Sequence, residues 1–193
     1  VKWSRQAGFD NLNIDLIYGL PEQTMAYWQK TVNLILGLNP EHLSLYALTL
    51  EHGTPFGRWS ERGLLPVPDP DVAAEMYEWA GERLALAGYE QYEISNWSKP
   101  GRQCRHNLQY WRNQTYLGFG AGAHGYAVGY RYSSVLHIKK YISRLNDFSD
   151  DTHPFPLTPA TVNQHRNSAR EDMQETMMTG LRLTREGISA RVF

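Results

Sequence analysis

The stretch Cys104–Asn113, with the sequence CRHNLQYWRN, holds the densest group of side chains that could bind a ligand. It combines one histidine with two aromatic residues and two arginines. A neutral imidazole can bind iron or zinc or act as a general base. Aromatic rings beside such a histidine suit a flat macrocycle, and arginines bind carboxylates such as porphyrin propionates. The stretch is therefore a candidate site for a flat ligand.

Each of these residues also has an ordinary structural interpretation. His106 is the leading candidate ligand, but a lone histidine more often forms a hydrogen bond to backbone in a loop. Tyr110 and Trp111 are typical core residues, and arginines are usually solvated surface charges; this applies to Arg102, Arg105 and Arg112. Residue types alone leave both interpretations open.

A glycine-rich run, Leu117–Tyr126, follows almost at once. Its spacing, GxGxG, differs from the dinucleotide-binding pattern GxGxxG, and no helix start follows it, so we reject a nucleotide-phosphate loop. Glycine lets backbone come close to a ligand, which makes this run a candidate wall of the same site. His124 lies inside the run.

The first fifty residues predict a βαβ unit. Asn11–Tyr18 is a short apolar run typical of a buried strand, Thr24–Leu36 has helical spacing of apolar residues and is expected to end at Gly37, and His42–Leu50 is a second strand. Strands joined in this way are parallel, and polar side chains at their carboxyl ends meet at one edge of the sheet. Asp15 and Thr49 are such side chains. For Asp15, a ligand contact and a structural carboxylate remain equally plausible.

The later elements follow from turn and capping signals. Asp69-Pro70 predicts the start of a helix that Gly88 ends. The remaining expectations are a loop over 51–68, a strand over 89–95, a hairpin over 126–132 with Gly129 at its tip, a helix over 134–145, a linker over 148–156 and a last helix from Thr158 to about Leu183. These elements indicate an α/β protein.

Composition excludes several classes of site and partner. The net charge of −1 gives no general attraction to nucleic acid, and no apolar run approaches the roughly 20 residues of a membrane span. The single cysteine, Cys104, excludes an internal disulfide and any zinc or iron–sulfur site built from the cysteines of this chain alone. It favours a reducing, cytoplasmic setting. The chain starts and stops in mid-element, and we expect it to be a fragment.

Several motifs, in order, resemble one family. The segment Asn13–Thr24, NIDLIYGLPEQT, is similar to a strand motif of the radical S-adenosylmethionine (SAM) proteins related to oxygen-independent coproporphyrinogen III oxidase. Within that group, His106–Trp111 matches the HNxxYW motif of the HemW-like heme chaperones. The similarity also covers 40–55, 92–96 and 117–126, and so extends over nearly the whole chain.

The resemblance implies a fold and a division into parts. The fold would be the later part of a partial (β/α) radical SAM barrel, followed by a mixed, partly helical C-terminal region. Residues 1–98 would belong to the barrel, 99–150 would close the site with the HNxxYW segment and the glycine run, and 151–193 would begin a C-terminal helical subdomain. The family's cluster motif, CxxxCxxC, is absent from this chain.

The resemblance also implies the site residues. Asp15, Thr49 and His124 match positions that contact SAM. His106 would be the heme-contacting residue and a ligand of the heme iron, while Asn107, Tyr110 and Trp111 would complete the heme pocket. The whole protein would hold a 4Fe–4S cluster and SAM, with cluster ligands outside this chain.

The leading hypothesis is a heme-binding and heme-delivering chaperone with a radical SAM core, in which heme is cargo. The alternative is an oxygen-independent coproporphyrinogen III oxidase, a radical SAM enzyme of porphyrin biosynthesis. The two differ at His106, because a chaperone needs an iron ligand and a porphyrinogen contains no iron. Expected partners are heme and heme-accepting proteins, with peripheral membrane association through such partners, and no nucleic acid. The expected location is the cytoplasm.

Overall fold

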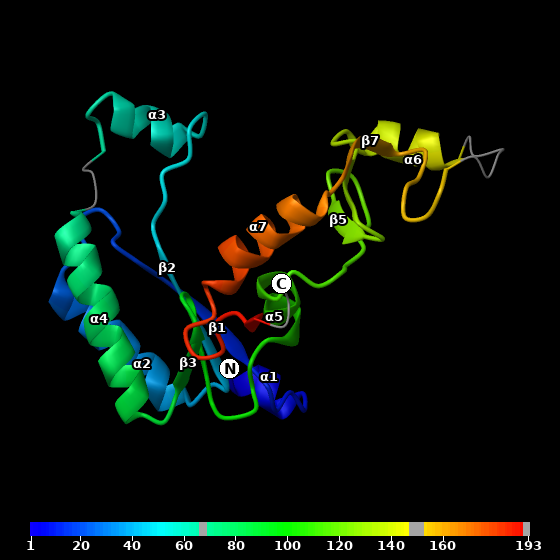
Figure 1. Cartoon of the computed structure of the whole chain (residues 1–193). Coiled ribbons are helices and arrows are strands. Elements are labelled where there is room, and N and C mark those ends of the chain that lie inside the picture. The colour runs from blue at the N-terminus through cyan, green and yellow to red at the C-terminus, as the bar shows by residue number, and fades with distance from the viewer. Residues whose placement is uncertain (66–68, 147–152, 191–193) are drawn as a thin grey trace. The chain divides into compact units, whose positions relative to one another are not determined.

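The computed structural model describes residues 1–65, 69–146 and 153–190 (Figure 1). The chain divides into two compact units, Val1–Cys104 and Arg105–Phe193. The expected domain boundaries at 98/99 and 150/151 remain predictions, and the second of them lies outside the described residues.

The first unit contains the predicted βαβ arrangement. After a short helix, α1 (Lys2–Gln6), strand β1 (Asn13–Tyr18) leads through α2 (Met25–Leu38) to β2 (His42–Ala47), and the two strands are parallel. Thr24 caps α2 by accepting a hydrogen bond from the Tyr27 backbone. The helix passes Gly37, where it was expected to end, because Asn39 adopts the left-handed conformation that ends it.

Two short strands complete the sheet of the first unit. The expected strand over 89–95 is instead a hairpin made of β3 (Glu90–Glu93) and β4 (Asn96–Ser98), and β4 pairs antiparallel with β2. The strand order is β1-β2-β4-β3. The expected loop over 51–68 contains a helix, α3 (Pro55–Glu61), which Thr54 caps.

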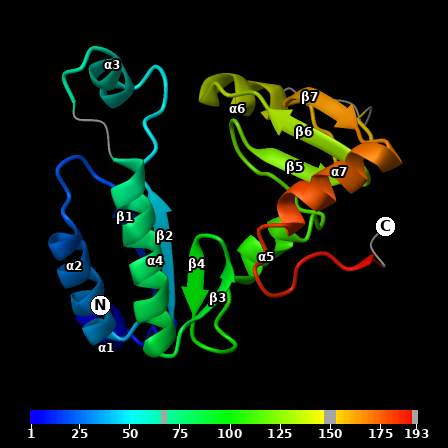
Figure 2. The same cartoon turned by 60° about the vertical axis from the view of Figure 1, so that its left-hand side comes forward.

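One face of this sheet is covered by helices. Helix α4 (Pro70–Leu86) begins at the predicted Asp69 cap and runs beside α2 over the strands (Figure 2). The core between helices and sheet consists of large apolar side chains: Trp28, Val32, Leu43, Leu45, Met76, Ala80, Leu84, Tyr89 and Trp97. The Trp28 indole donates a hydrogen bond to the Met76 carbonyl at 2.8 Å, which satisfies its buried N–H.

The second unit begins with the candidate stretch, which forms helix α5 (Arg105–Trp111). The predicted hairpin consists of β5 (His124–Ala127) and β6 (Tyr130–Ser134), with Gly129 in its turn. Helix α6 (Ile138–Asn146) follows.

The end of the chain differs from the sequence-based expectation. In place of one helix from Thr158, the chain forms β7 (Thr161–Arg166), which pairs with β6, and then α7 (Ala169–Gly180). Ser168 and Glu171 form a capping box at the start of α7, with each side chain bonded to the backbone of the other residue. The three-stranded sheet therefore has the order β5-β6-β7.

No helix in the described ranges is both long and apolar enough to cross a membrane.

Candidate functional site

Asp15 lies on the face of the first sheet that α2 and α4 leave uncovered. Side chains alternate along β1, so Ile14 and Leu16 pack against the core while Asn13 and Asp15 point to the opposite face and are exposed. The prediction that Asp15 is a buried carboxylate is therefore wrong. The apolar run suggested burial on both faces, but α2 and α4 cover only the face that carries Ile14 and Leu16.

Thr49 follows β2 and lines a hollow of about 520 Å³ at the carboxyl ends of β1 and β2. Tyr18, Gly19 and Ala73 are among the other lining residues. Burial of the Tyr18 phenol, together with the nearby Tyr77, raises its pKa, so this wall is neutral at ordinary pH. The hollow is apolar enough for a flat ring, and Thr49 is one of the few polar residues that line it.

The HNxxYW residues lie on a helix. His106 and Tyr110 are four positions apart on α5, and their rings meet edge to face with centroids 4.7 Å apart. His106 is exposed, and within the described residues its imidazole forms no hydrogen bond. Both ring nitrogens are therefore free to bind a metal or a hydrogen-bonding ligand. The side chain of Asn107 is half-buried on the next position of the same helix.

A second tyrosine extends this ring contact. Tyr110 meets Tyr116 with centroids 4.6 Å apart, and Tyr116 lines a hollow of about 300 Å³ in the second unit. His124 and His165 line the same hollow. The exposed first residue of β5, His124, is thus placed near the HNxxYW helix through Tyr116, whereas Asp15 and Thr49 belong to the first unit.

Trp111 and Arg112 contact the end of the chain. The Arg182 guanidinium lies 4.2 Å from the centroid of the Trp111 ring, a cation–π contact. Arg112 forms two hydrogen bonds to the Glu186 carboxylate, at 2.8 and 2.6 Å, and this pairing raises the pKa of Arg112. Arg112 is therefore committed to Glu186, whereas Arg102 and Arg105 are exposed and remain candidates for binding a carboxylate.

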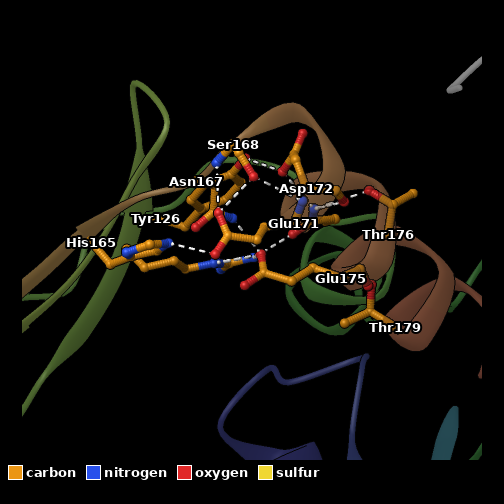
Figure 3. A network of polar contacts seen from close by, with 11 residues as sticks. Tyr126, His165, Asn167, Ser168, Glu171, Asp172, Glu175, Thr176 and Thr179 are labelled. Atoms are coloured by element: carbon orange, nitrogen blue, oxygen red, sulfur yellow. Dashed lines mark hydrogen bonds and ion pairs between the residues drawn. The ribbon is translucent and has the colours of Figure 1, made fainter.

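A polar network joins the β5–β6 hairpin to α7 (Figure 3), and Asn113, just after α5, takes part in it. Asn113 adopts a left-handed conformation just after the helix, and its amide donates hydrogen bonds to Asp172 Oδ1 at 3.1 Å and to Thr176 Oγ1 at 3.0 Å. Its oxygen accepts a hydrogen bond from Arg131. Arg131 also binds Glu175 at 2.6 Å. The network therefore joins α5 to the β5–β6 hairpin and to α7.

Tyr126 closes the same network. Its ring lies 3.8 Å from the Arg131 guanidinium, and its hydroxyl donates a hydrogen bond to Asp172. Burial and this hydrogen bond raise the pKa of Tyr126 to about 12. The hydroxyl is thus a permanent donor at neutral pH and serves to position Asp172.

The glycines of the run serve packing. A Cβ on Gly118 would lie 2.0 Å from the His124 carbonyl oxygen, and one on Gly125 would lie 2.2 Å from the Tyr132 ring. These positions require glycine because protein atoms fill the space beside them. The expectation that the run lets backbone approach a ligand is not needed to explain Gly118 and Gly125.

The residues of this chain fit one group that the resemblance implies, heme, but not the 4Fe–4S cluster. Among the described residues, no three His, Cys, Asp or Glu side chains lie close enough to hold a metal ion. A 4Fe–4S cluster needs several thiolates, and Cys104 is the single cysteine, so these residues do not fit such a cluster by themselves. Heme iron needs only one or two axial ligands, and the His106 imidazole, which has no hydrogen-bond partner in the described part of the chain, fits that role.

Comparison with known proteins identifies close relatives. The heme chaperone HemW of Synechocystis is 42% identical over 175 residues, which are 91% of this chain and 41% of the relative. The heme chaperone HemW of Bacillus subtilis is 39% identical over 190 residues, which are 98% of this chain and 48% of the relative. The chain thus spans less than half the length of these relatives. No protein-family model matches it.

The fold also has a solved counterpart. The structure of coproporphyrinogen III oxidase (HemN) from Escherichia coli, described as a radical SAM enzyme, matches with a TM-score of 0.71 and 19% identity, over 94% of this chain and 42% of that one. At this identity the likeness concerns the fold. It confirms the α/β class and the predicted relation to a radical SAM fold.

Two sets of residues were not predicted. The Asn113 network and a hydrogen-bond chain around His42 both join residues far apart in sequence. A signal for the second set was present in the sequence, because Asn13 and His42 are polar residues among the apolar residues of two strands. Buried polar side chains need hydrogen-bond partners.

Proposed function

We propose that this chain, a member of the HemW-like family of radical SAM proteins over the region that it shares with them, serves in binding and delivering heme. The observation that carries the proposal is the HNxxYW helix α5. There the His106 imidazole is exposed, forms no hydrogen bond within the described residues and meets the Tyr110 ring edge to face. An imidazole of this kind can bind heme iron, and neighbouring rings suit the flat macrocycle.

The proposal extends to the cofactors of the radical SAM proteins. Asp15, Thr49 and His124 are proposed to contact SAM, with Asn107 and Trp111 completing the heme pocket beside Tyr110. A 4Fe–4S cluster would be held by residues outside this chain. Heme is cargo in this scheme and is passed to heme-accepting proteins in the cytoplasm, some of them associated with membranes.

Heme titration of the purified protein tests the central claim. We expect a Soret band on adding heme, and His106→Ala should weaken the binding or shift the band. His137→Ala is a matched control, because His137 is an exposed histidine of the same unit. An unchanged spectrum and affinity in His106→Ala would show that His106 does not bind the heme iron.

The fold match to a coproporphyrinogen III oxidase makes decarboxylation of a porphyrinogen the second candidate function. That substrate contains no iron, so His106 would have no metal to bind. Anaerobic incubation of the cluster-loaded, full-length protein with coproporphyrinogen III and SAM decides between the two. Product formation at a steady rate would favour the enzyme over the chaperone.

A further inference from the structure

A chain of hydrogen bonds crosses the uncovered face of the first sheet and ends at Asp15. Asn13 and His42 are direct neighbours on the parallel strands β1 and β2. His42 Nδ1 lies 2.6 Å from Asn13 Oδ1, and His42 Nε2 lies 2.8 Å from the Tyr92 hydroxyl. Asn13 Nδ2 lies 2.6 Å from Asp15 Oδ1. Three side chains thus connect β3 to the carboxylate of Asp15.

Asp15 fixes the directions of the first two of these hydrogen bonds, and a neutral His42 ring fixes the third. An ionised carboxylate only accepts, so Asn13 must turn its NH₂ group toward Asp15. Asn13 Oδ1 then accepts from His42 Nδ1, which must carry the proton. In a neutral ring His42 Nε2 is then left as an acceptor, and Tyr92 donates to it. The Tyr92 oxygen in turn accepts from the Cys104 backbone N–H at 3.3 Å.

The chain of hydrogen bonds is buried at its His42–Tyr92 end and exposed to solvent at its Asp15 end. His42 and Tyr92 are 5% and 6% exposed, whereas Asp15 is exposed to solvent. Ser44 adds a further donor to Asn13 Oδ1, at 3.3 Å. Burial lowers the pKa of His42, partly offset by the charges of Asp15 and Glu93, which favours the neutral ring in which Nε2 accepts from Tyr92. The buried side chains of His42 and Tyr92 therefore give rigid support to a carboxylate that a ligand can reach.

We propose that Asn13, His42 and Tyr92 are positioning residues, which hold the Asp15 carboxylate in one orientation for a ligand that donates hydrogen bonds, such as the hydroxyls of a ribose. An acidic side chain that accepts from ribose hydroxyls is a common way to bind a nucleoside. This inference rests on the proposed role of Asp15 as a SAM contact, but the hydrogen-bond chain itself can be tested without SAM.

Nitrogen-15 NMR of the His42 ring in the full chain tests the bonding pattern. We expect a neutral ring near pH 7.5, protonated at Nδ1, and Tyr92→Phe should shift the Nε2 signal because it removes the donor. Tyr89→Phe is the matched control: it also loses a buried hydroxyl, which donates to the Pro40 carbonyl, but it lies outside the chain of bonds. A ring protonated at Nε2, or equal effects of the two variants, would overturn the proposal.

A double-mutant cycle on SAM affinity tests whether these residues act through Asp15. In the cluster-loaded, full-length protein, calorimetry of His42→Leu should show roughly three- to tenfold weaker SAM binding, the effect of one or two lost hydrogen bonds. In an Asp15→Ala background the same change should have little further effect. Full additivity of the two losses would show that His42 does not act through Asp15. Absence of SAM binding by the unaltered protein would instead contradict the proposed function, and the NMR result would still decide on the chain of bonds.

Discussion

The ring of Tyr110 meets the ring of Tyr116 edge to face, with centroids 4.6 Å apart and ring planes at 76°. Tyr110 makes the same kind of contact with His106, with centroids 4.7 Å apart and ring planes at 84°. Tyr116 also pairs through its backbone with Tyr126 of the hairpin, with N···O distances of 2.7 and 2.9 Å. Tyr116, which is fixed to the β-sheet of the second unit, therefore supports His106 through the Tyr110 ring.

Removing Tyr116 should weaken heme binding even though His106 remains. An aromatic pair contributes about 0.5–1.5 kcal/mol, so Tyr116→Ala should weaken heme affinity by roughly two- to tenfold. Tyr116→Phe keeps the ring and should bind almost as the unaltered protein does. Absorbance titration at the Soret band measures both. Equal affinities of the alanine and phenylalanine variants would show that the Tyr116 ring does not support the ligand.

Asn113 should contribute to the stability of the second unit through its side chain. Asn113→Gly preserves the left-handed backbone but deletes the bonds to Asp172, Thr176 and Arg131, and we expect a loss of about 1–3 kcal/mol in the free energy of unfolding. The control is Asn39→Gly, another left-handed asparagine, which should change stability far less. Urea denaturation followed by circular dichroism gives both values. Similar losses at the two positions would contradict a role for the network.

Val128 is an unfavourable residue for its turn. Val128 and Gly129 both have positive φ, 51° and 77°, between the paired residues Ala127 and Tyr130, which is the geometry of a type I′ hairpin. A β-branched residue is strained there, and Val128 is 59% exposed, so little packing would be lost. Val128→Asn creates the preferred Asn-Gly turn and should stabilise the protein by about 0.5–2 kcal/mol.

Thermal unfolding measures this gain. Val162→Asn, a change of the same chemistry at an exposed position of strand β7, provides a control of opposite sign, because asparagine is unfavourable in a strand. A lower melting temperature for Val128→Asn would contradict the turn assignment.

Local signals in the sequence predicted much of the fold. The alternation of strand, helix and strand predicted the parallel pair β1–β2, and Asp69-Pro70 predicted the start of α4. Thr158-Pro159 predicts a helix start that is too early, because α7 begins after Ser168 and the residues before it form β7. The capping box of Ser168 and Glu171 was the overlooked signal for its true start.

The candidate site was less predictable, for a physical reason. The sequence singled out His106 and Tyr110 as parts of one motif, but it did not predict the helix that makes them neighbours. It also could not show which face of β1 would be covered, and so it misjudged the burial of Asp15. The contacts of His42 span 29 and 50 residues, and such pairings depend on strand order. The motif residues were recognisable, whereas the residues that position them were not.

His42 should make the stability of the protein depend on pH below neutrality. Burial lowers its pKa in the folded protein, so the unfolded chain binds a proton more readily. The contribution of the neutral ring is therefore fully present above the unfolded pKa of about 6.5 and is lost as the pH falls toward the lower folded pKa. Protonation also removes the acceptor that Tyr92 needs at Nε2.

Urea denaturation of matched variants at a series of pH values from 8 to about 5 tests this. Carboxylates that titrate over the same range contribute equally to all the variants, so a difference in slope between two variants reports on the replaced histidine. His42→Gln should lose stability less steeply than the unaltered protein as the pH falls through this range. His137→Gln replaces an exposed histidine and should follow the unaltered protein. If the two variants lose stability with the same slope, His42 is not buried as a neutral acceptor, and the hydrogen-bond chain that ends at Asp15 loses its central member.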